Sequence, residues 1–216
     1  MVYLEDCMIG MARYPDKHFD LALIDVPYGL GEASGQEKSR NQSKGRAQTK
    51  VKYAIKNWDK EAPPKNYFNE LIRVSKNQII WGANHFISKI PYDSSCWVVW
   101  DKDNSGDFAD CELAWTSFNT AVRRFKYRWN GMLQENMKDK ERRIHPTQKP
   151  VALYDWLLKN YAKQGYKILD THVGSGSSRI SAYKGGFDFT GFEIDKEYFE
   201  AQEKRFNNFK AQLTLF

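Results

Sequence analysis

Short runs of apolar residues recur along the chain and are typical of buried β-strands. They are rich in Ile, Val, Leu and Trp, and they lie at residues 21–24, 78–81, 97–100, 168–169 and 189–192. Stretches with the length of helices separate several of these runs, at residues 65–74, 151–163 and 177–184. This alternation predicts an α/β fold with a mostly parallel sheet.

The end of the chain predicts one further helix. Asp195 is placed to cap its start, because a carboxylate accepts hydrogen bonds from the first free amides of a helix. The apolar residues that follow can share one broad face, namely Tyr198, Ala201, Phe206 and Phe209. We expect this face to pack on the sheet.

The length and composition fit a single domain. The 216 residues are 41% hydrophobic, which suits one core. We expect one domain over residues 1–216, with insertions at about 31–57 and about 120–143. Glu5 and Asp6 interrupt the first apolar stretch, and no run approaches the roughly 18 residues of a membrane span. These features predict a cytoplasmic protein without membrane attachment.

The cysteines do not suggest a metal site. Cys7, Cys96 and Cys111 lie far apart, and neither a Cys-x-x-Cys pair nor a His/Cys cluster offers the ligand spacing of zinc. We expect free thiols and no metal.

Two segments carry much of the net charge of +6, which favours an anionic partner. Residues 36–56 hold seven Lys/Arg against one acid, and residues 123–143 hold eight against three. The first segment is polar and can bind phosphates or be a solvated linker. The candidate nucleic-acid contacts are Lys38, Arg40, Lys44, Arg46, Arg123, Arg124, Lys126 and Arg128.

The second segment also contains Phe125, Tyr127 and Trp129, a mixture that can contact phosphates and stack on bases. For Trp129, a core position and base stacking are equally open. Trp97 and Trp100 belong to an apolar run and are expected in the core.

A glycine turn links an apolar strand to a helix at residues 167–178. It contains Gly174, Ser175 and Gly176, and such a turn lets a ligand approach the backbone closely. About twenty residues later Glu193 closes a second strand, where nucleotide-binding folds place the acid that binds ribose. Alone, the turn is as consistent with a tight connection as with a ligand site.

An acid, a rigid turn and an aromatic ring follow the first apolar run as Asp25-Val26-Pro27-Tyr28. Ligands collect at the carboxyl ends of parallel strands. By itself this segment also fits an ordinary strand exit, with Asp25 capping backbone amides.

Together these segments resemble the β-type, circularly permuted amino-methylating DNA methyltransferases of the N-4/N-6 family. Asp25-Val26-Pro27-Tyr28 resembles the signature Asp-Pro-Pro-Tyr, and residues 170–177 resemble the cofactor loop Asp-Pro-Phe-x-Gly-Ser-Gly-Thr. The hexapeptide His-Pro-Thr-Gln-Lys-Pro at 145–150 matches a motif of this family. Residues 4–7 and the segments 100–102 and 112–115 resemble further family segments, so the resemblance runs from Asp6 to about Arg205.

The resemblance implies a Rossmann-like fold, S-adenosylmethionine as cofactor and double-stranded DNA as partner. It implies a cell that is bacterial or phage-infected, with a restriction-modification context, and leaves a homodimer open. The resemblance also implies that Asp25, Val26, Pro27 and Tyr28 are the catalytic residues at the target amine, and that residues at about 120–143 form a short target-recognition region. The implied cofactor residues are Asp6, Cys7, Gln148, Lys149, Pro150, Asp170, Val173, Gly174, Ser175, Gly176, Ser177, Glu193 and Ile194.

Asp25 favours adenine N6 as the target, since cytosine-N4 enzymes of this family often carry Ser at that position. Cytosine-N4 methylation, RNA methylation and a catalytically impaired nucleic-acid-binding homologue remain alternatives. The last is motivated by Val26 in place of proline and by Thr171-His172-Val173 in place of Pro-Phe-x. We expect His172 to pack or form hydrogen bonds and not to act as a catalyst.

The residue types suit the chemistry. An exocyclic amine is a poor nucleophile, so acceptors must hold its hydrogens while a methyl donor lies in line. The Asp25 carboxylate and the Val26 carbonyl can be these acceptors. A base inside a duplex cannot reach such a pocket, so we expect it to be flipped out and stacked on Tyr28.

Overall fold

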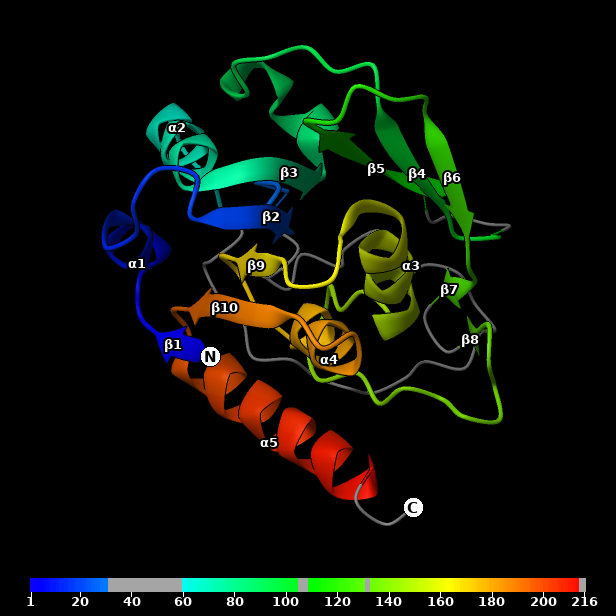
Figure 1. The fold of residues 1–216 in the computed structure, drawn as a ribbon. Coiled ribbons are helices and arrows are strands. Elements are labelled where there is room, and N and C mark those ends of the chain that lie inside the picture. The colour runs from blue at the N-terminus through cyan, green and yellow to red at the C-terminus, as the bar shows by residue number, and fades with distance from the viewer. Residues whose placement is uncertain (31–59, 105–108, 131–132, 214–216) are drawn as a thin grey trace.

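The computed structural model describes residues 1–30, 60–104, 109–130 and 133–213 (Figure 1). Eight strands form its main sheet in the order β1-β10-β9-β2-β3-β5-β4-β6. They are β1 (Val2–Leu4), β2 (Phe19–Ile24), β3 (Ser75–Trp81), β4 (Trp97–Asp101), β5 (Cys111–Thr116), β6 (Arg123–Lys126), β9 (Lys167–Asp170) and β10 (Asp188–Glu193). Strands β7 (Trp129–Asn130) and β8 (Leu133–Gln134) form a separate pair.

The sheet is mostly parallel, as predicted. Strand β5 runs against both of its neighbours, and the other paired strands run in the same direction. Each of the five apolar runs lies in one of these strands. The carboxyl ends of β2, β3, β9 and β10 therefore meet at one edge of the sheet.

Five α-helices cover the sheet in the described residues. They are α1 (Cys7–Ala12), α2 (Lys65–Val74), α3 (Val151–Tyr161), α4 (Ser177–Lys184) and α5 (Lys196–Leu213). Helices α2 and α4 have the predicted bounds. Helix α3 ends two residues before the predicted end, because Ala162 turns to an extended conformation. None of these helices combines the length and the apolar character that a membrane span requires.

The central strands contain continuous apolar runs because both faces of the sheet are covered there. In β2, Leu21 and Leu23 pack with residues of α3, whereas Ala22 and Ile24 pack with residues of α1 and α2. This alternation follows from the two-residue period of a strand. Helices α1 and α2 lie on one side of the sheet and α3 and α4 on the other (Figure 1).

The last helix begins as predicted. Asp195 Oδ1 accepts hydrogen bonds from the amides of Glu197 at 2.9 Å and Tyr198 at 3.2 Å. Tyr198 and Phe206 are buried, which fixes the apolar face of α5 against the domain.

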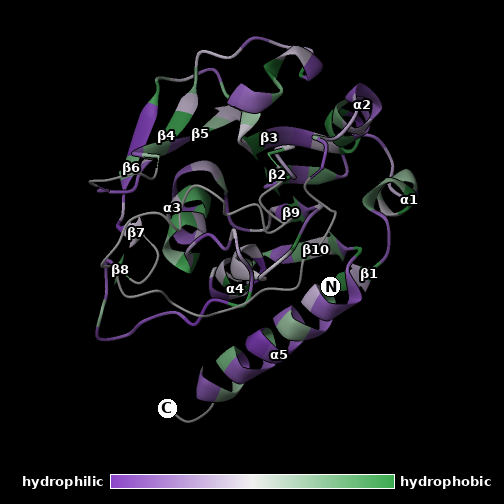
Figure 2. Ribbon diagram, turned by 180° about the vertical axis from the view of Figure 1, so that it is seen from behind, coloured by the Kyte–Doolittle hydropathy of each residue, from purple (hydrophilic) through white to green (hydrophobic). Residues whose placement is uncertain are grey.

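Residues 123–126 belong to the segment that the sequence predicts as an insertion, and they form the edge strand β6, which pairs with β4. The physical reason is their alternation, since Phe125 is half-buried while Arg123, Arg124 and Lys126 are exposed. Figure 2 shows this strand as a hydrophilic edge of the sheet.

Candidate active site

The segment after β2 lies at the sheet edge where the carboxyl ends of the parallel strands meet. Val26 is buried, and Asp25 and Tyr28 are half-buried. The Tyr28 ring lies so close to Gly82, just after β3, that a Cβ there would fall 2.1 Å from the ring. Gly82 has a φ of +70°, so the close approach and the backbone conformation both require glycine. His85 also stacks on the ring, at 5.3 Å between centroids.

Four side chains from distant parts of the chain meet beside Tyr28. Lys149 Nζ lies 2.5 Å from Asp25 Oδ1, 3.2 Å from Glu112 Oε2 and 3.0 Å from the Tyr28 hydroxyl. The Tyr28 hydroxyl lies 3.0 Å from the same Oδ1 of Asp25. Lys102 forms a salt bridge with the other oxygen of Glu112. We call Asp25, Glu112, Lys149 and Lys102 the ion-pair cluster.

Burial and charge act against each other in this cluster. Burial raises the pKa of Asp25, and the nearby Lys149 ammonium opposes that rise. Lys149 and Lys102 hold the pKa of Glu112 at about 2 in spite of its burial. The two carboxylates also keep the pKa of Lys149 above its ordinary value. Two acidic and two basic side chains therefore compensate one another at this site.

The conformation of the glycine loop between β9 and α4 depends on two glycines and on the Glu193 carboxylate. Gly174 and Gly176 have positive φ angles of 51° and 75°, a conformation that side chains with a Cβ rarely adopt. The Gly174 amide donates to Glu193 Oε2 at 2.8 Å, and the Asp195 amide donates to Oε1 of the same carboxylate at 2.9 Å. Glu193 therefore connects the glycine loop to the end of β10.

Asp170, at the end of β9, lies beneath this loop with only 2% of its surface exposed. Its carboxylate accepts hydrogen bonds from the His172 amide and the Ser178 hydroxyl. Burial raises the pKa of Asp170 to about 7, against the lowering effect of these hydrogen bonds. The observed contacts give Asp170 a role in shaping the loop.

Arg205 of α5 binds the end of the glycine loop that leads into α4. Its guanidinium donates to the Ser175 carbonyl at 2.8 Å and to the Ser177 hydroxyl at 2.9 Å. It also forms a salt bridge of 2.7 Å with Glu141, which accepts the Val151 amide at the start of α3. The C-terminal helix thus helps to fix the loop.

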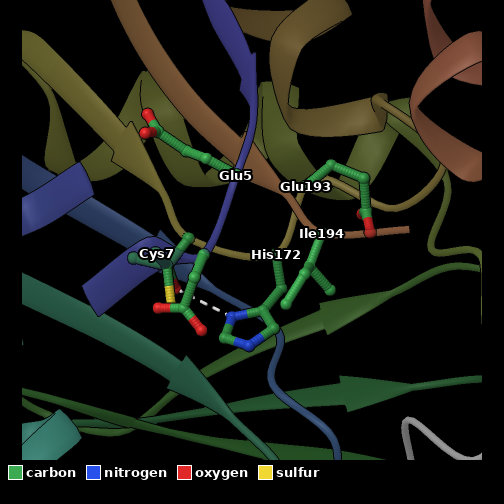
Figure 3. A pocket seen from close by; sticks show the side chains of 7 residues that line it. Glu5, Cys7, His172, Glu193 and Ile194 are labelled. Carbon is green, nitrogen blue, oxygen red and sulfur yellow. Dashed lines mark hydrogen bonds between the residues drawn. The ribbon is translucent and has the colours of Figure 1, made fainter. Parts of the chain in front are cut away.

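A hollow opens beside the glycine loop (Figure 3). Its walls come from the β1–α1 connection, the start of the loop and the end of β10, and its lining residues are Glu5, Asp6, Cys7, Thr171, His172, Glu193 and Ile194. We call this space the acidic hollow after its three carboxylates. Ile194 is 64% exposed at its edge and offers an apolar surface for a flat ring.

Two side chains of the acidic hollow have fixed roles in the fold. Asp6 caps α1, where its Oδ1 accepts the Met8 amide at 2.7 Å. His172 Nδ1 lies 2.9 Å from the Thr171 hydroxyl, which in turn contacts the Tyr67 hydroxyl at 2.5 Å. Burial lowers the pKa of His172 to about 4, so its imidazole is neutral at pH 7. These hydrogen bonds agree with the expectation that His172 packs and bonds.

The hexapeptide at residues 145–150 does not line the acidic hollow. Lys149 joins the ion-pair cluster instead, and Pro150 is the N-cap residue of α3. Gln148 is buried, and its side-chain oxygen accepts the Ile144 amide at 2.9 Å. The Lys149 carbonyl accepts the Ser177 hydroxyl at 2.8 Å, so the hexapeptide joins the glycine loop to the ion-pair cluster. Val173 of the glycine loop is buried, and its amide donates to the Phe192 carbonyl.

The predicted basic contacts divide into two groups. Arg123, Arg124, Lys126 and Arg128 are exposed along and after β6. Lys126 and Arg128 form salt bridges with Asp103, and Arg124 lies 3.9 Å from Asp101. The others lie outside the described residues, namely Lys38, Arg40, Lys44 and Arg46.

The aromatic residues of this segment pack inward. Trp129 is 5% exposed, and its indole nitrogen donates to the Gln148 carbonyl at 2.8 Å. Phe125 stacks on Tyr127 and contacts Trp156 of α3. Trp129 is thus a core residue, because its one polar atom finds a partner inside the protein.

Sequence reasoning did not single out Glu112, Lys102 or Arg205 as site residues. Glu112 carries a signal that could have found it, since it is an acid in the otherwise largely apolar strand β5. A buried charge requires a partner. The identity of that partner, however, depends on the tertiary fold.

The sequence is similar to those of known DNA methyltransferases. Residues 93–204, more than half of the chain, match a family described as DNA methylase, the N6/N4 type. The type II methyltransferase M2.DpnII of Streptococcus pneumoniae is 25% identical over 240 residues, covering 90% of this chain and 85% of the relative.

Two solved structures share the fold. The crystal structure of the M1.HpyAVI–SAM complex matches with a TM-score of 0.56 at 17% identity, over 95% of this chain and 98% of that chain. The PvuII DNA methyltransferase, described as cytosine-N4-specific, matches with a TM-score of 0.60 at 11% identity, over 95% and 85%. The main sheet and its helices are therefore arranged as in DNA methyltransferases.

Proposed function

The chain belongs to the N6/N4 DNA methylase family, and on that premise we propose that it methylates the exocyclic N6 amine of adenine in double-stranded DNA. The observation that carries this proposal is the pairing of Asp25. Its Oδ1 contacts both Lys149 and Tyr28, whereas no contact to Oδ2 is found among the described residues. Oδ2 can therefore accept a hydrogen of the target amine.

We propose that S-adenosylmethionine binds between the acidic hollow and the glycine loop. The hollow supports this by its chemistry: Glu193 lies where a ribose is bound in nucleotide-binding folds, and Ile194 offers a surface to an adenine ring. The glycines allow a close approach of the cofactor to the backbone. When bound, the cofactor would supply a methyl group on a positively charged sulfur.

The residues of the chain would then position the amine. Asp25 and the Val26 carbonyl hold its hydrogens, which orients the nitrogen lone pair. The transfer forms a nitrogen–carbon bond and breaks the carbon–sulfur bond, whose electron pair moves to sulfur. One amine proton is released. Positioning and electrostatics are sufficient roles for the protein in such a step.

The order of the segments supports the β-type, permuted arrangement. Asp25 follows β2, and the glycine loop follows β9 much later in the chain, yet the two strands are neighbours in the sheet. We further propose that residues 1–216 act as one domain. The exposed cations of β6 and the basic segment 36–56 would contact DNA phosphates.

Cytosine N4 is the second candidate target, because the PvuII enzyme of the same fold is described as cytosine-N4-specific. Asp25 favours adenine, since the family's cytosine enzymes often carry Ser there. The test is to incubate the protein with radiolabelled S-adenosylmethionine and duplex DNA of mixed sequence, with RNA as the control. Label in N6-methyldeoxyadenosine supports the proposal, label in N4-methyldeoxycytidine replaces the target, and no label in DNA contradicts it.

A further inference from the structure

Lys149 carries a buried charge whose role the proposed chemistry does not yet explain. Only 4% of its side chain is exposed, and its ammonium contacts Asp25, Glu112 and Tyr28. Burying an ammonium group costs several kcal/mol unless partners compensate. The three contacts compensate it, and they place the charge on the carboxylate that is proposed to hold the target amine.

We propose that Lys149 is a positioning residue for methyl transfer and that Glu112 balances its charge, an inference that rests on the function proposed above. Lys149 holds Oδ1 of Asp25 and leaves Oδ2 for the amine hydrogen. Its charge keeps Asp25 ionised inside the protein, where an acceptor is needed. Lys149 thus acts through Asp25 and not through the cofactor.

Glu112 is the second carboxylate that contacts the Lys149 ammonium. Its Oε2 lies 3.2 Å from Lys149 Nζ and 3.4 Å from the Tyr28 hydroxyl, and its Oε1 is held by Lys102. Without Glu112, the Lys149 ammonium would be drawn entirely to Asp25. Without Lys149, the two carboxylates would face each other across the Tyr28 hydroxyl, and like charges disfavour ionisation of both.

Several groups act on the charge of Asp25 from the surrounding elements. They are Lys149, Glu112, Tyr28, Tyr154 and Asp170, with Lys102 behind Glu112. Lys149 lowers the pKa of Asp25 and Glu112 raises it. Removing one or the other should therefore move the pKa of Asp25 in opposite directions. A purely structural role for the two residues would not produce opposite shifts.

The experiment compares Lys149→Met, Lys149→Arg and Glu112→Gln by the pH dependence of kcat at saturating cofactor and DNA. In Lys149→Met we expect kcat at pH 7 to fall about 100-fold. The acid limb of the pH profile, where kcat falls as Asp25 is protonated, should move to higher pH by about one unit or more. Lys149→Arg should recover part of the rate, because it keeps the charge. In Glu112→Gln the acid limb should move to lower pH.

Two readouts distinguish a positioning role of Lys149 from a role in cofactor binding. The carboxyl carbon of Asp25 can be titrated by 13C NMR in the free protein, with its signal identified by its loss in Asp25→Asn. The affinity for S-adenosylmethionine can be measured by equilibrium binding, and it should stay within about threefold in Lys149→Met. A cofactor affinity at least tenfold weaker with an unchanged acid limb would overturn the inference and assign Lys149 to the cofactor site.

A double variant distinguishes the loss of a charge from a loss of folding. Lys149→Met with Glu112→Gln removes one charge of each sign, so the cluster stays neutral, and its acid limb should lie between those of the single variants. Unchanged titration of Asp25 in all three would overturn the inference. If the wild-type protein transfers no methyl group to DNA, the proposed function fails, but the titration of the free protein still tests Lys149.

Discussion

Asp25 and Asp170 lie at the ends of neighbouring parallel strands, yet their carboxylates have different partners. Asp25 is paired with a buried ammonium, that of Lys149. Asp170 accepts hydrogen bonds from a hydroxyl and an amide, and burial raises its pKa to about 7. We propose that the first carboxylate holds the target amine, whereas the contacts of the second stabilise the glycine loop. Ion pairs dominate the first region, whereas positive-φ glycines and hydrogen bonds shape the second.

The largest effect is expected from removing the carboxylate of Asp25, which tests whether the two carboxylates differ in role. Asp25→Ala should lower the methylation rate by at least about 1000-fold, because a positioned electrostatic group is lost from the transfer step. The affinity for S-adenosylmethionine should stay within about threefold, since the carboxylate lies outside the acidic hollow. Single-turnover methylation and equilibrium binding measure the two quantities.

The control for this variant is Asp25→Asn, which keeps the shape of the side chain and removes its charge. It should lose nearly as much rate as Asp25→Ala, because the lost acceptor charge matters more than lost volume. A methylation rate near that of the wild type in either variant would remove Asp25 from the mechanism.

The sequence was sufficient to locate both regions but not to describe the first. The glycine loop and the segment after β2 are contiguous motifs, so their residues could be named in advance. Lys149 and Asp25 are 124 positions apart, and their pairing depends on how β2 and α3 pack. The aromatic residues after Arg124 could be named from the sequence, but whether Trp129 lies in the core or stacks on bases depended on its partner, the Gln148 carbonyl.

Asp170 gives a pH-dependent prediction for the second region. Its folded pKa of about 7 is raised from the ordinary 3.8, so the folded state binds a proton more tightly than the unfolded chain. Its contribution to stability is therefore fully present below pH 4 and is lost as the pH rises to about 7. Replacing it with Asn should abolish this loss, which we expect to be on the order of 4 kcal/mol for a shift of about three pKa units.

The measurement is urea unfolding of the wild type and Asp170→Asn at several pH values. The difference in unfolding free energy between the two proteins should change in favour of the variant from pH 4 to pH 7. A constant difference over this range would mean that folding does not raise the pKa of Asp170.

A substitution at Gly176 tests whether the glycine loop requires a positive φ at this position. Gly176→Ala places a Cβ at a φ of +75° and 3.2 Å from Gln202, which costs about 1–2 kcal/mol. The affinity for S-adenosylmethionine should fall about tenfold, with a smaller effect on kcat at saturation. The matched control is Gly165→Ala, with a φ of +85° and open space around it, which should lose stability but keep cofactor affinity.

The smallest expected effect concerns DNA binding by the charges that β6 exposes. Among the described residues no salt bridge involves Arg123, whereas Lys126 is paired with Asp103 at 2.7 Å. A cation that binds a phosphate releases counterions, so Arg123→Gln should lower the slope of log affinity against log salt by about 0.9. Lys126→Gln should change it less, because part of that charge is already neutralised by Asp103. Equal slopes in the wild type and Arg123→Gln would mean that Arg123 does not contact a DNA phosphate.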